Sequence, residues 1–301
     1  MFDIQVNGAY GVDFNDDALT LDAFQFACVK LHATGVSRFF PTIITAPVET
    51  MGARIRKIVS YIEQDSTLAS LVAGVHIEGP FISRLSGYRG THPECSILDA
   101  HPDVAKQLID YGRGHIRMLT LAPETDHQFK TTEYLANQSV VVFGGHSDAT
   151  FDCLNQAINY GLKGFTHLGN GCALEVNRHE NIISRVLSLR KKLFVSMIAD
   201  GVHLPYWLLR SFVEIIGFEN VIITSDSMSA AGMPPGEYQI SGQPIIVDED
   251  RRTRHRDHNY LAGSASTLQE MRHHSDRWLP PNFEHVDRLF KQNAATLFGV
   301  A

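Results

Sequence analysis

Cysteine is scarce in this 301-residue sequence, which contains four cysteines and no Cys-x-x-Cys pair. Scattered thiols are typical of a reducing compartment and provide neither a disulfide framework nor a zinc knuckle. No stretch approaches the roughly 20 apolar residues that cross a bilayer, and the first residues lack the basic and apolar regions of a signal peptide. We therefore expect a cytoplasmic protein that has no membrane partner.

Positively charged residues are also fewer than negatively charged ones. The sequence has 26 Lys and Arg against 33 Asp and Glu, a net charge of -7. This balance argues against a nucleic-acid partner, because binding to phosphate backbones depends on clustered basic residues. It does not exclude a small anionic substrate in a local basic pocket. The 15 histidines, in contrast, invite a search for metal ligands.

The chain shows no low-complexity tract and no linker rich in proline or serine that would divide it into domains. Instead, short hydrophobic runs alternate with amphipathic helical stretches, and each run is nearly continuous, as in strands buried on both faces. The runs are Phe2–Asn7, Arg38–Thr45, Val72–Glu78, Ile116–Ala122, Val140–His146, Gly164–His167, Phe194–Ala199 and Val221–Ser225.

Helix patterns separate these runs; Phe24, Ala27, Cys28 and Leu31, for example, share one helix face. Eight strands with helices between them predict an α/β fold of the (β/α)8 TIM-barrel type. A doubly wound open sheet is the alternative, but the sequence has no Gly-x-Gly-x-x-Gly turn at the start of a helix.

We expect a single barrel over residues 1–301, with one interruption. The segment at about 234–262 is rich in Gly, Pro, Asp and Arg, and Gln243–Val247 within it is strand-like. This composition predicts an excursion or lid after the eighth strand. A last helix, Glu284–Leu297, would then close the barrel.

Polar side chains gather where the predicted strands end, and in a TIM barrel the carboxyl ends of the strands form the active-site face. One such residue alone serves as often as a cap or a loop anchor. A glutamate, histidines and an aspartate on one rim, however, match a catalytic metal site with an open position. The segments are His76–Pro80, Gly145–Asp148, Thr166–Asn170, Ala199–His203 and Ser225–Ser227.

These motifs, in this order, resemble the N-acetylglucosamine-6-phosphate deacetylase family of the amidohydrolase superfamily. The resemblance covers nearly the whole chain, including its first strand. It is carried by Asp3-Ile-Gln-Val-Asn-Gly, His76-Ile-Glu-Gly-Pro-Phe, Gly145-His-Ser-Asp-Ala-Thr, Thr166-His-Leu-x-Asn, Ala199-Asp-Gly-Val-His, Thr224-Ser-Asp and Leu261-Ala-Gly-Ser-Ala.

The resemblance implies a role for each matching side chain. Glu78, His146 and His167 would bind the metal, Asp226 would act as general base and then general acid, and His92 would lie near the substrate acyl group. The implied reaction is hydrolysis of N-acetylglucosamine-6-phosphate, or of a related N-acetylamino sugar phosphate, to the amino-sugar phosphate and acetate.

The resemblance also implies the residues that bind the substrate. Asn170 and Gly171 would contact the phosphate, and His203 would contact the sugar. Arg178 matches an arginine that reaches a phosphate across a dimer interface, so a homodimer is expected. Its alternative role is a surface ion pair with Glu175 or Glu180.

The first strand indicates how many metal ions to expect. Many amidohydrolases have His-x-His there and hold a second metal, whereas this chain has Gln5 and Asn7. Amides are poor ligands beside imidazole. We expect one divalent ion, with zinc as first choice and iron, manganese or cobalt as alternatives. Gln5 and Asn7 would form hydrogen bonds to the substrate, or within the barrel rim.

Three features depart from the family pattern. Members usually carry a small β-sandwich domain, and the sequence predicts a barrel that lacks it. Gly169 and Gly171 flank Asn170 where larger residues are expected, and the residues around Arg178 also differ. The alternatives are therefore an amidohydrolase for an unphosphorylated or cyclic amide, or a non-catalytic metal-binding barrel.

Overall fold

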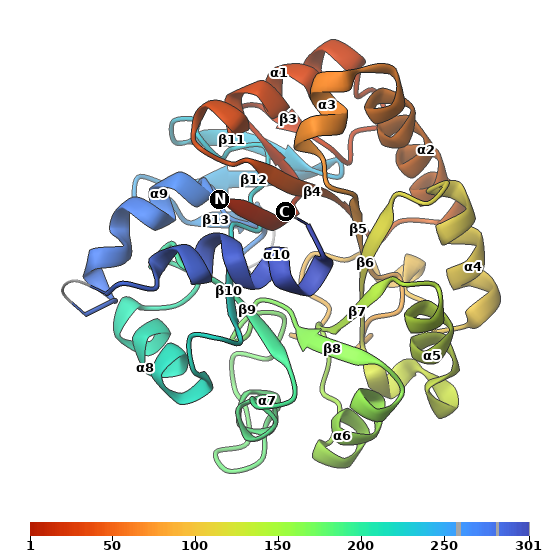
Figure 1. Cartoon of the computed structure of the whole chain (residues 1–301), viewed down its shortest axis with the longest axis vertical. Helices are drawn as coiled ribbons and strands as arrows, with labels where there is room; N and C mark the ends of the chain where they lie inside the picture. Colours follow the sequence, from red (N-terminus) through yellow and green to blue (C-terminus); the bar gives the residue numbers. More distant parts are fainter. Residues whose placement is uncertain (257–259, 281–282, 301) are drawn as a thin grey trace.

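Eight parallel strands form the ring at the centre of the molecule (Figure 1). The computed structural model describes residues 1–256, 260–280 and 283–300. The strands follow one another around the ring in chain order, and Val6 and Ser227 form a bridge between its first and last members. They are β1 (Phe2–Val6), β4 (Arg38–Ile44), β5 (Val75–Glu78), β6 (Ile116–Leu121), β7 (Val141–Gly144), β8 (Leu162–Phe165), β9 (Phe194–Ile198) and β10 (Val221–Thr224).

The predicted barrel is confirmed, since each of the eight hydrophobic runs contains or overlaps one of these strands. The largest differences are at β5, which begins three residues after the predicted start at Val72, and at β8, which begins two residues before the predicted run. Val72 forms only an isolated bridge with Phe39 before β5, and the start of β8 was missed because it contains the exposed Lys163.

Helices surround the ring and cover its outer face. Helix α1 (Leu21–Ala33) begins at a Thr20 cap, and its buried residues are Phe24, Ala27, Cys28 and Leu31, the predicted stripe. The other helices are α2 (Val48–Gln64), α3 (Ser66–Leu71), α4 (Pro102–Tyr111), α5 (Lys130–Asn137), α6 (Phe151–Asn159), α7 (Ile182–Ser188), α8 (Tyr206–Ile216), α9 (Leu268–His273) and α10 (Asn293–Phe298), with short 3-10 turns at Glu94–Ser96, Pro123–Thr125, His127–Phe129 and His274–Arg277. None of the described helices has the length and apolar composition needed to cross a membrane.

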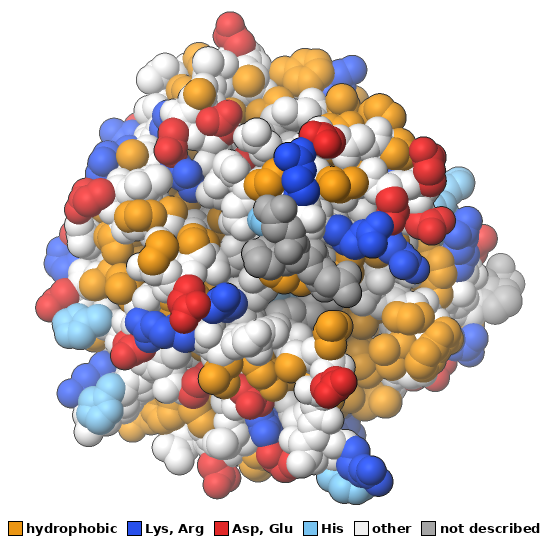
Figure 2. All heavy atoms as spheres, turned by 180° about the vertical axis from the view of Figure 1, so that it is seen from behind, with side chains coloured by type: hydrophobic (Ala, Val, Ile, Leu, Met, Phe, Trp, Pro, Cys, Tyr) orange, Lys and Arg blue, Asp and Glu red, His pale blue; other side chains and the backbone are white. Residues whose placement is uncertain are grey.

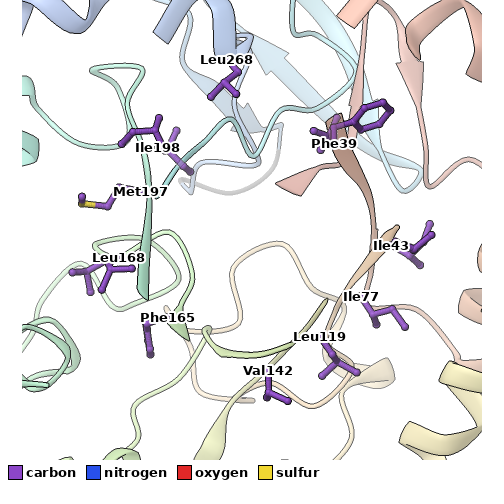
Figure 3. Close-up of a cluster of buried hydrophobic side chains, with 14 of the residues drawn as sticks. Phe39, Ile43, Ile77, Leu119, Val142, Phe165, Leu168, Met197, Ile198 and Leu268 are labelled. Carbon is purple, nitrogen blue, oxygen red and sulfur yellow. The ribbon is translucent and has the colours of Figure 1, made fainter. Parts of the chain in front are cut away.

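The layer between strands and helices is the main hydrophobic core. Alternate strand residues, such as Ile43, Ile77, Leu119 and Val142, point outward from successive strands toward the helices (Figure 3). Each of these four side chains is fully buried. Because side chains alternate across a strand, the remaining strand residues point into the barrel.

A second cluster fills the amino-terminal end of the barrel interior. Phe2, Phe40 and Phe298 pack with edge-on or tilted rings, at centroid distances between 4.8 and 6.0 Å. Phe298 belongs to α10, which lies across the ring close to the amino terminus (Figure 1). The predicted last helix, Glu284–Leu297, begins four residues later than expected, as a π-helical turn at Arg288–Gln292 that leads into α10.

The segment after β10 forms a three-stranded antiparallel sheet of β11 (Gly236–Ile240), β12 (Gln243–Val247) and β13 (Thr253–His255). Strand β12 coincides with the predicted strand-like piece. A small two-stranded ladder, β2 (Gly8–Ala9) with β3 (Val12–Asp13), follows the first barrel strand. That the protein lacks a β-sandwich domain stays a prediction.

We expect Phe298→Ala to lower the free energy of unfolding by about 3 kcal/mol, because it removes a buried ring and leaves a cavity between Phe2 and Phe40. Urea unfolding monitored by circular dichroism would measure the change. Phe26→Ala is the matched control, because Phe26 is 49% exposed on α1 and its loss should have a small effect. Equal losses in the two variants would contradict this account of the barrel end.

Candidate metal centre and active site

Side chains from the carboxyl ends of the strands meet in a pocket of about 360 Å³. The face of the molecule opposite α10 carries a mixture of hydrophobic, acidic and basic side chains (Figure 2). All the predicted site residues except Gln5 and Arg178 line the pocket: Asn7, Glu78, His92, His146, His167, Asn170, Gly171, His203 and Asp226.

Three of these residues have a strained backbone. His146, His167 and Asp226 have φ values of 50°, 30° and 46°, in the left-handed region that non-glycine residues rarely adopt. Such conformations cost about 1 to 3 kcal/mol each and persist where the surrounding structure imposes them. Each one follows a barrel strand directly, so the strain turns a side chain at the strand end over the pocket.

Glu78 is the centre of the site. His167 Nε2 lies 3.0 Å and His146 Nε2 lies 3.5 Å from Glu78 Oε1, while His92 Nε2 lies 3.8 Å from Oε2. Gln5 Nε2 also donates to Oε1, at 2.9 Å. Burial alone would raise the pKa of Glu78, but His146 and His167 hold it well below its usual range.

The arrangement of protons at His146 fits a bound cation. Its Nδ1 lies 2.7 Å from the backbone carbonyl of Tyr88, which only accepts, so Nδ1 carries the proton. Nε2 then faces the Glu78 carboxylate at 3.5 Å and is the nitrogen left to bind a cation. A histidine whose other nitrogen donates to a carbonyl is the usual form of a metal ligand.

His92 joins the same cluster. Ligand atoms of Glu78, His92 and His146 lie within 4.8 Å of one another. Thr45 Oγ1 holds His92 Nδ1 at 2.8 Å, and burial followed by the charge of His146 lowers the pKa of His92 to about 3. The structure thus brings His92 to the carboxylate together with the three side chains predicted as ligands. A carboxylate with imidazoles is a donor set that suits zinc and related divalent ions.

Gln5 and Asn7 direct amide N–H groups at carboxylates. Gln5 donates to Glu78 and accepts from the Thr166 hydroxyl at 2.8 Å, while Asn7 Nδ2 donates to Asp226 Oδ1 at 2.8 Å. A hydrogen-bond donor is thereby placed where a second metal ligand would have to offer a lone pair. Gln5 is fully buried beneath the pocket and contacts Glu78 from below.

Asp226 lies on the rim beside Asn7 and His203. Burial, and then the negative charge of Glu78, raises the pKa of Asp226 to about 6. His203 Nδ1 lies 2.7 Å from Asp200 Oδ2, and the Ser264 hydroxyl donates to the same oxygen at 2.8 Å. Asp200 stood in the motif Ala199–His203, but the sequence indicated no role for it; the structure makes it the group that orients His203.

The phosphate-binding residues expected after β8 lie above the histidines. A Cβ on Gly171 would come within 2.9 Å of His146 Nδ1 and 3.2 Å of His167 Cε1, so that only glycine fits there. The Asn170 side-chain nitrogen is buried and has no hydrogen-bond partner among the described residues. Gly171 therefore lets the loop pack closely on the two histidines, and Asn170 keeps an unused donor for a ligand.

Arg178 lies outside this pocket. It is exposed, and the predicted alternative of an ion pair with Glu175 or Glu180 is wrong, because Glu180 pairs with Arg185. Within the described part of the chain, Arg178 has no ion-pair partner. No other lysine or arginine lines the pocket either.

Arg185 on α7 is a residue that sequence reasoning missed. It is 8% exposed and donates to the backbone oxygens of Asp148 and Ala149, to the Asp148 carboxylate and to Glu180. One guanidinium therefore ties the loop after His146 to the loop that carries Arg178. An arginine at a helical position gives no sign of this in the sequence, since such residues are usually solvated.

A (β/α)8 barrel with a carboxylate–histidine cluster and a separate aspartate at its strand ends defines the class of metal-dependent barrel hydrolases. No protein-family model matches the sequence. It is 30% identical to N-acetylglucosamine-6-phosphate deacetylase of Haemophilus influenzae, over 89% of this chain and 68% of the relative, and 30% identical to N-acetylgalactosamine-6-phosphate deacetylase of Escherichia coli O157:H7, over 81% and 63%.

Solved structures agree with the sequence relatives. N-acetyl-D-glucosamine-6-phosphate deacetylase of Mycobacterium smegmatis, in complex with N-acetyl-D-glucosamine-6-phosphate, has a TM-score of 0.90 and 28% identity, covering 99% of this chain and 77% of that one. The chain belongs to the N-acetylglucosamine-6-phosphate deacetylase family. It spans 61 to 74% of the length of the curated relatives it matches.

We expect one divalent metal ion per chain, because Gln5 and Asn7 place N–H donors where a second site would need ligands. Elemental analysis of purified protein would measure it. Glu78→Gln and His167→Ala should lose the metal, while His92→Ala should keep it, since His92 lies farther from the carboxylate. Glu63→Gln, a surface carboxylate on α2, is the control for Glu78. Two ions per chain at full activity would refute the single-metal prediction.

Proposed function

We propose that this chain is a metal-dependent hydrolase that converts N-acetylglucosamine-6-phosphate, or a closely related N-acetylamino sugar phosphate, to the amino-sugar phosphate and acetate. The observation that carries the proposal is that one pocket contains two carboxylates in different surroundings. Histidine nitrogens lie next to Glu78, whereas none of the described histidines forms an ion pair with Asp226. Glu78 is held by imidazoles and Asp226 by the Asn7 amide. Family membership supports the same reaction.

Glu78, His146 and His167 would hold the metal, for which zinc is our first choice. A divalent ion supplies Lewis acidity, which acidifies water and polarises an amide carbonyl. The remaining work falls to side chains of this chain. Gln5 keeps the Glu78 carboxylate in place from below, and His92 lies on the far carboxylate oxygen, beside the place where the acyl carbon would react.

Asp226 would transfer the protons. It takes one from the attacking water and then delivers it to the departing sugar nitrogen, so that one carboxylate is first base and then acid. Asn7 donates to Oδ1, which leaves Oδ2 available for the proton. A pKa near 6 suits a group that must both accept and release a proton close to neutral pH.

The sugar and its phosphate would lie over the loop after β8. Asn170 offers an unused amide donor, and Gly171 lets this loop pack closely on the two histidines. His203, oriented by Asp200, would contact a sugar hydroxyl. No lysine or arginine lines this pocket within the described chain, so a permanently charged partner for a phosphate dianion would have to come from outside it, such as Arg178 of a second subunit. We therefore propose a homodimer in which each Arg178 serves the partner's site.

The absence of a lysine or arginine from the pocket lining also favours a second candidate, an amidohydrolase for an unphosphorylated amide. The metal centre and Asp226 would act in the same way. The two candidates differ in the effect of the substrate phosphate: its removal should lower kcat/KM only for an enzyme that acts on phosphorylated sugars.

Asp226→Asn should lower turnover by roughly two to four orders of magnitude, because asparagine keeps the shape but cannot accept a proton. Metal content should stay near the wild-type value. Acetate release and elemental analysis on the same preparation measure both. Asp99→Asn, an exposed carboxylate, is the control. A variant that retains more than a tenth of wild-type turnover would show that Asp226 is not the base.

Arg178→Ala should raise KM for the phosphorylated substrate strongly and leave the unphosphorylated analogue nearly unchanged, since an arginine fork binds a phosphate dianion through paired hydrogen bonds. Mixing Arg178→Ala with Asp226→Asn chains should restore some activity, because one site of a mixed dimer has both groups intact. Arg210→Ala, a surface arginine on α8, is the control. A monomer by light scattering, or equal losses on both substrates, would contradict the dimer proposal.

A further inference from the structure

The lining of the pocket combines polar and aliphatic groups around Glu78. Asn170 offers an amide donor that has no partner among the described residues, and Gly171 packs closely on His146 and His167. Ile44 and Ile240 supply an aliphatic part of the lining.

Ile44 is fixed next to the metal centre by strand register. It is the last residue of β4, and its partner in the parallel ladder is Glu78 on β5. Paired residues of neighbouring strands point to the same face of a sheet, so both side chains enter the barrel mouth together. Ile44 is 2% exposed. An aliphatic side chain therefore lies beside Glu78 at the mouth of the barrel.

Ile240 adds the second part of this wall from the sheet β11–β13. It is 3% exposed and packs in one cluster with Ile44, Met228 and Ile245. It pairs across the β11–β12 turn with Gln243, whose side chain donates to the Thr91 backbone oxygen, one residue before His92. The turn therefore places Ile240 near the His92 side of the pocket.

The turn that carries Ile240 is anchored to the barrel. The Ser241 backbone N–H donates to Asp13 Oδ2 at 2.6 Å, and Arg54 donates to the Ser241 hydroxyl at 2.8 Å. Together with the Gln243 contact, these bonds tie two residues of the turn region, Ser241 and Gln243, to three separate barrel segments. Ile240 is thus part of a fixed wall, and a larger group cannot displace it without breaking them.

We infer that Ile44 and Ile240 form the acyl-binding wall of the active site and restrict the N-acyl group to a short chain. The inference rests on the proposed function. A scissile amide at the metal centre has a sugar on its nitrogen and an alkyl group on its carbon. The sugar needs polar partners such as the Asn170 amide, whereas the alkyl group suits the aliphatic lining at Ile44 and Ile240.

The test measures kcat/KM for the N-acetyl, N-propionyl and N-butyryl forms of glucosamine-6-phosphate. Ile240→Ala should raise the butyryl-to-acetyl ratio by about tenfold or more, the usual value of a methylene in a hydrophobic pocket. Ile240→Phe should lower the propionyl-to-acetyl ratio. Because each ratio is taken on one preparation, partial unfolding of a variant cancels from it.

Ile246→Ala is the matched control. Ile246 lies on β12 of the same sheet but is 37% exposed, between the buried Ile245 and Val247. Its ratios should equal those of the wild type. An unchanged ratio in both Ile240 variants, or the same shift in Ile246→Ala, would overturn the inference. If the wild type releases no carboxylic acid from any of these substrates, the proposed function itself fails.

Discussion

The buried carboxylate of Glu78 is the interaction on which the rest of the site depends. An ionised carboxylate away from water is costly unless several partners compensate it. Its partners come from distant parts of the chain: Gln5 from β1, His146 from the end of β7, His167 from the end of β8 and His92 from the loop after β5. They meet only when the barrel closes, so closure of the ring and assembly of the site are one event.

The partners that compensate the Glu78 charge lie at one end of the barrel, and the barrel interior is accordingly arranged in layers. Phenylalanines fill the end beneath α10, and this layer supports the fold without polar groups. Above it His76 is held between the Thr42 and Thr120 hydroxyls, and burial lowers its pKa to about 4, which keeps it neutral. The ionisable groups of the site then occupy the open end. The groups proposed to hold a metal and a substrate are thus separated from the phenylalanine layer at the other end of the barrel.

The sequence predicted the features that depend on hydrophobic periodicity and on the order of motifs along the chain. Buried parallel strands are continuous hydrophobic runs, and the polar residues that follow them mark the carboxyl ends of the strands. The barrel and the residues of its pocket could therefore be predicted. Contacts set by tertiary packing were not. Arg185 has the pattern of a solvated helix residue, yet it is buried between Asp148 and Glu180. The last helix was predicted to begin too early, because Glu284 and His285 form a turn that precedes it.

The two carboxylates of the site have pKa values displaced in opposite directions. Histidines hold the pKa of Glu78 down, whereas burial and the Glu78 charge raise that of Asp226, and such a difference suits separate roles as ligand and proton carrier. The strained backbone of Asp226 is held by the chain beyond β13, because its carbonyl accepts from Ser264 N–H and the Ser264 carbonyl accepts from Met228 N–H. Met228 in turn packs with Ile240 of β11. The chain after β10 therefore lines the pocket through Ile240 and, through Ser264, holds the proposed base at an angle that its own backbone disfavours.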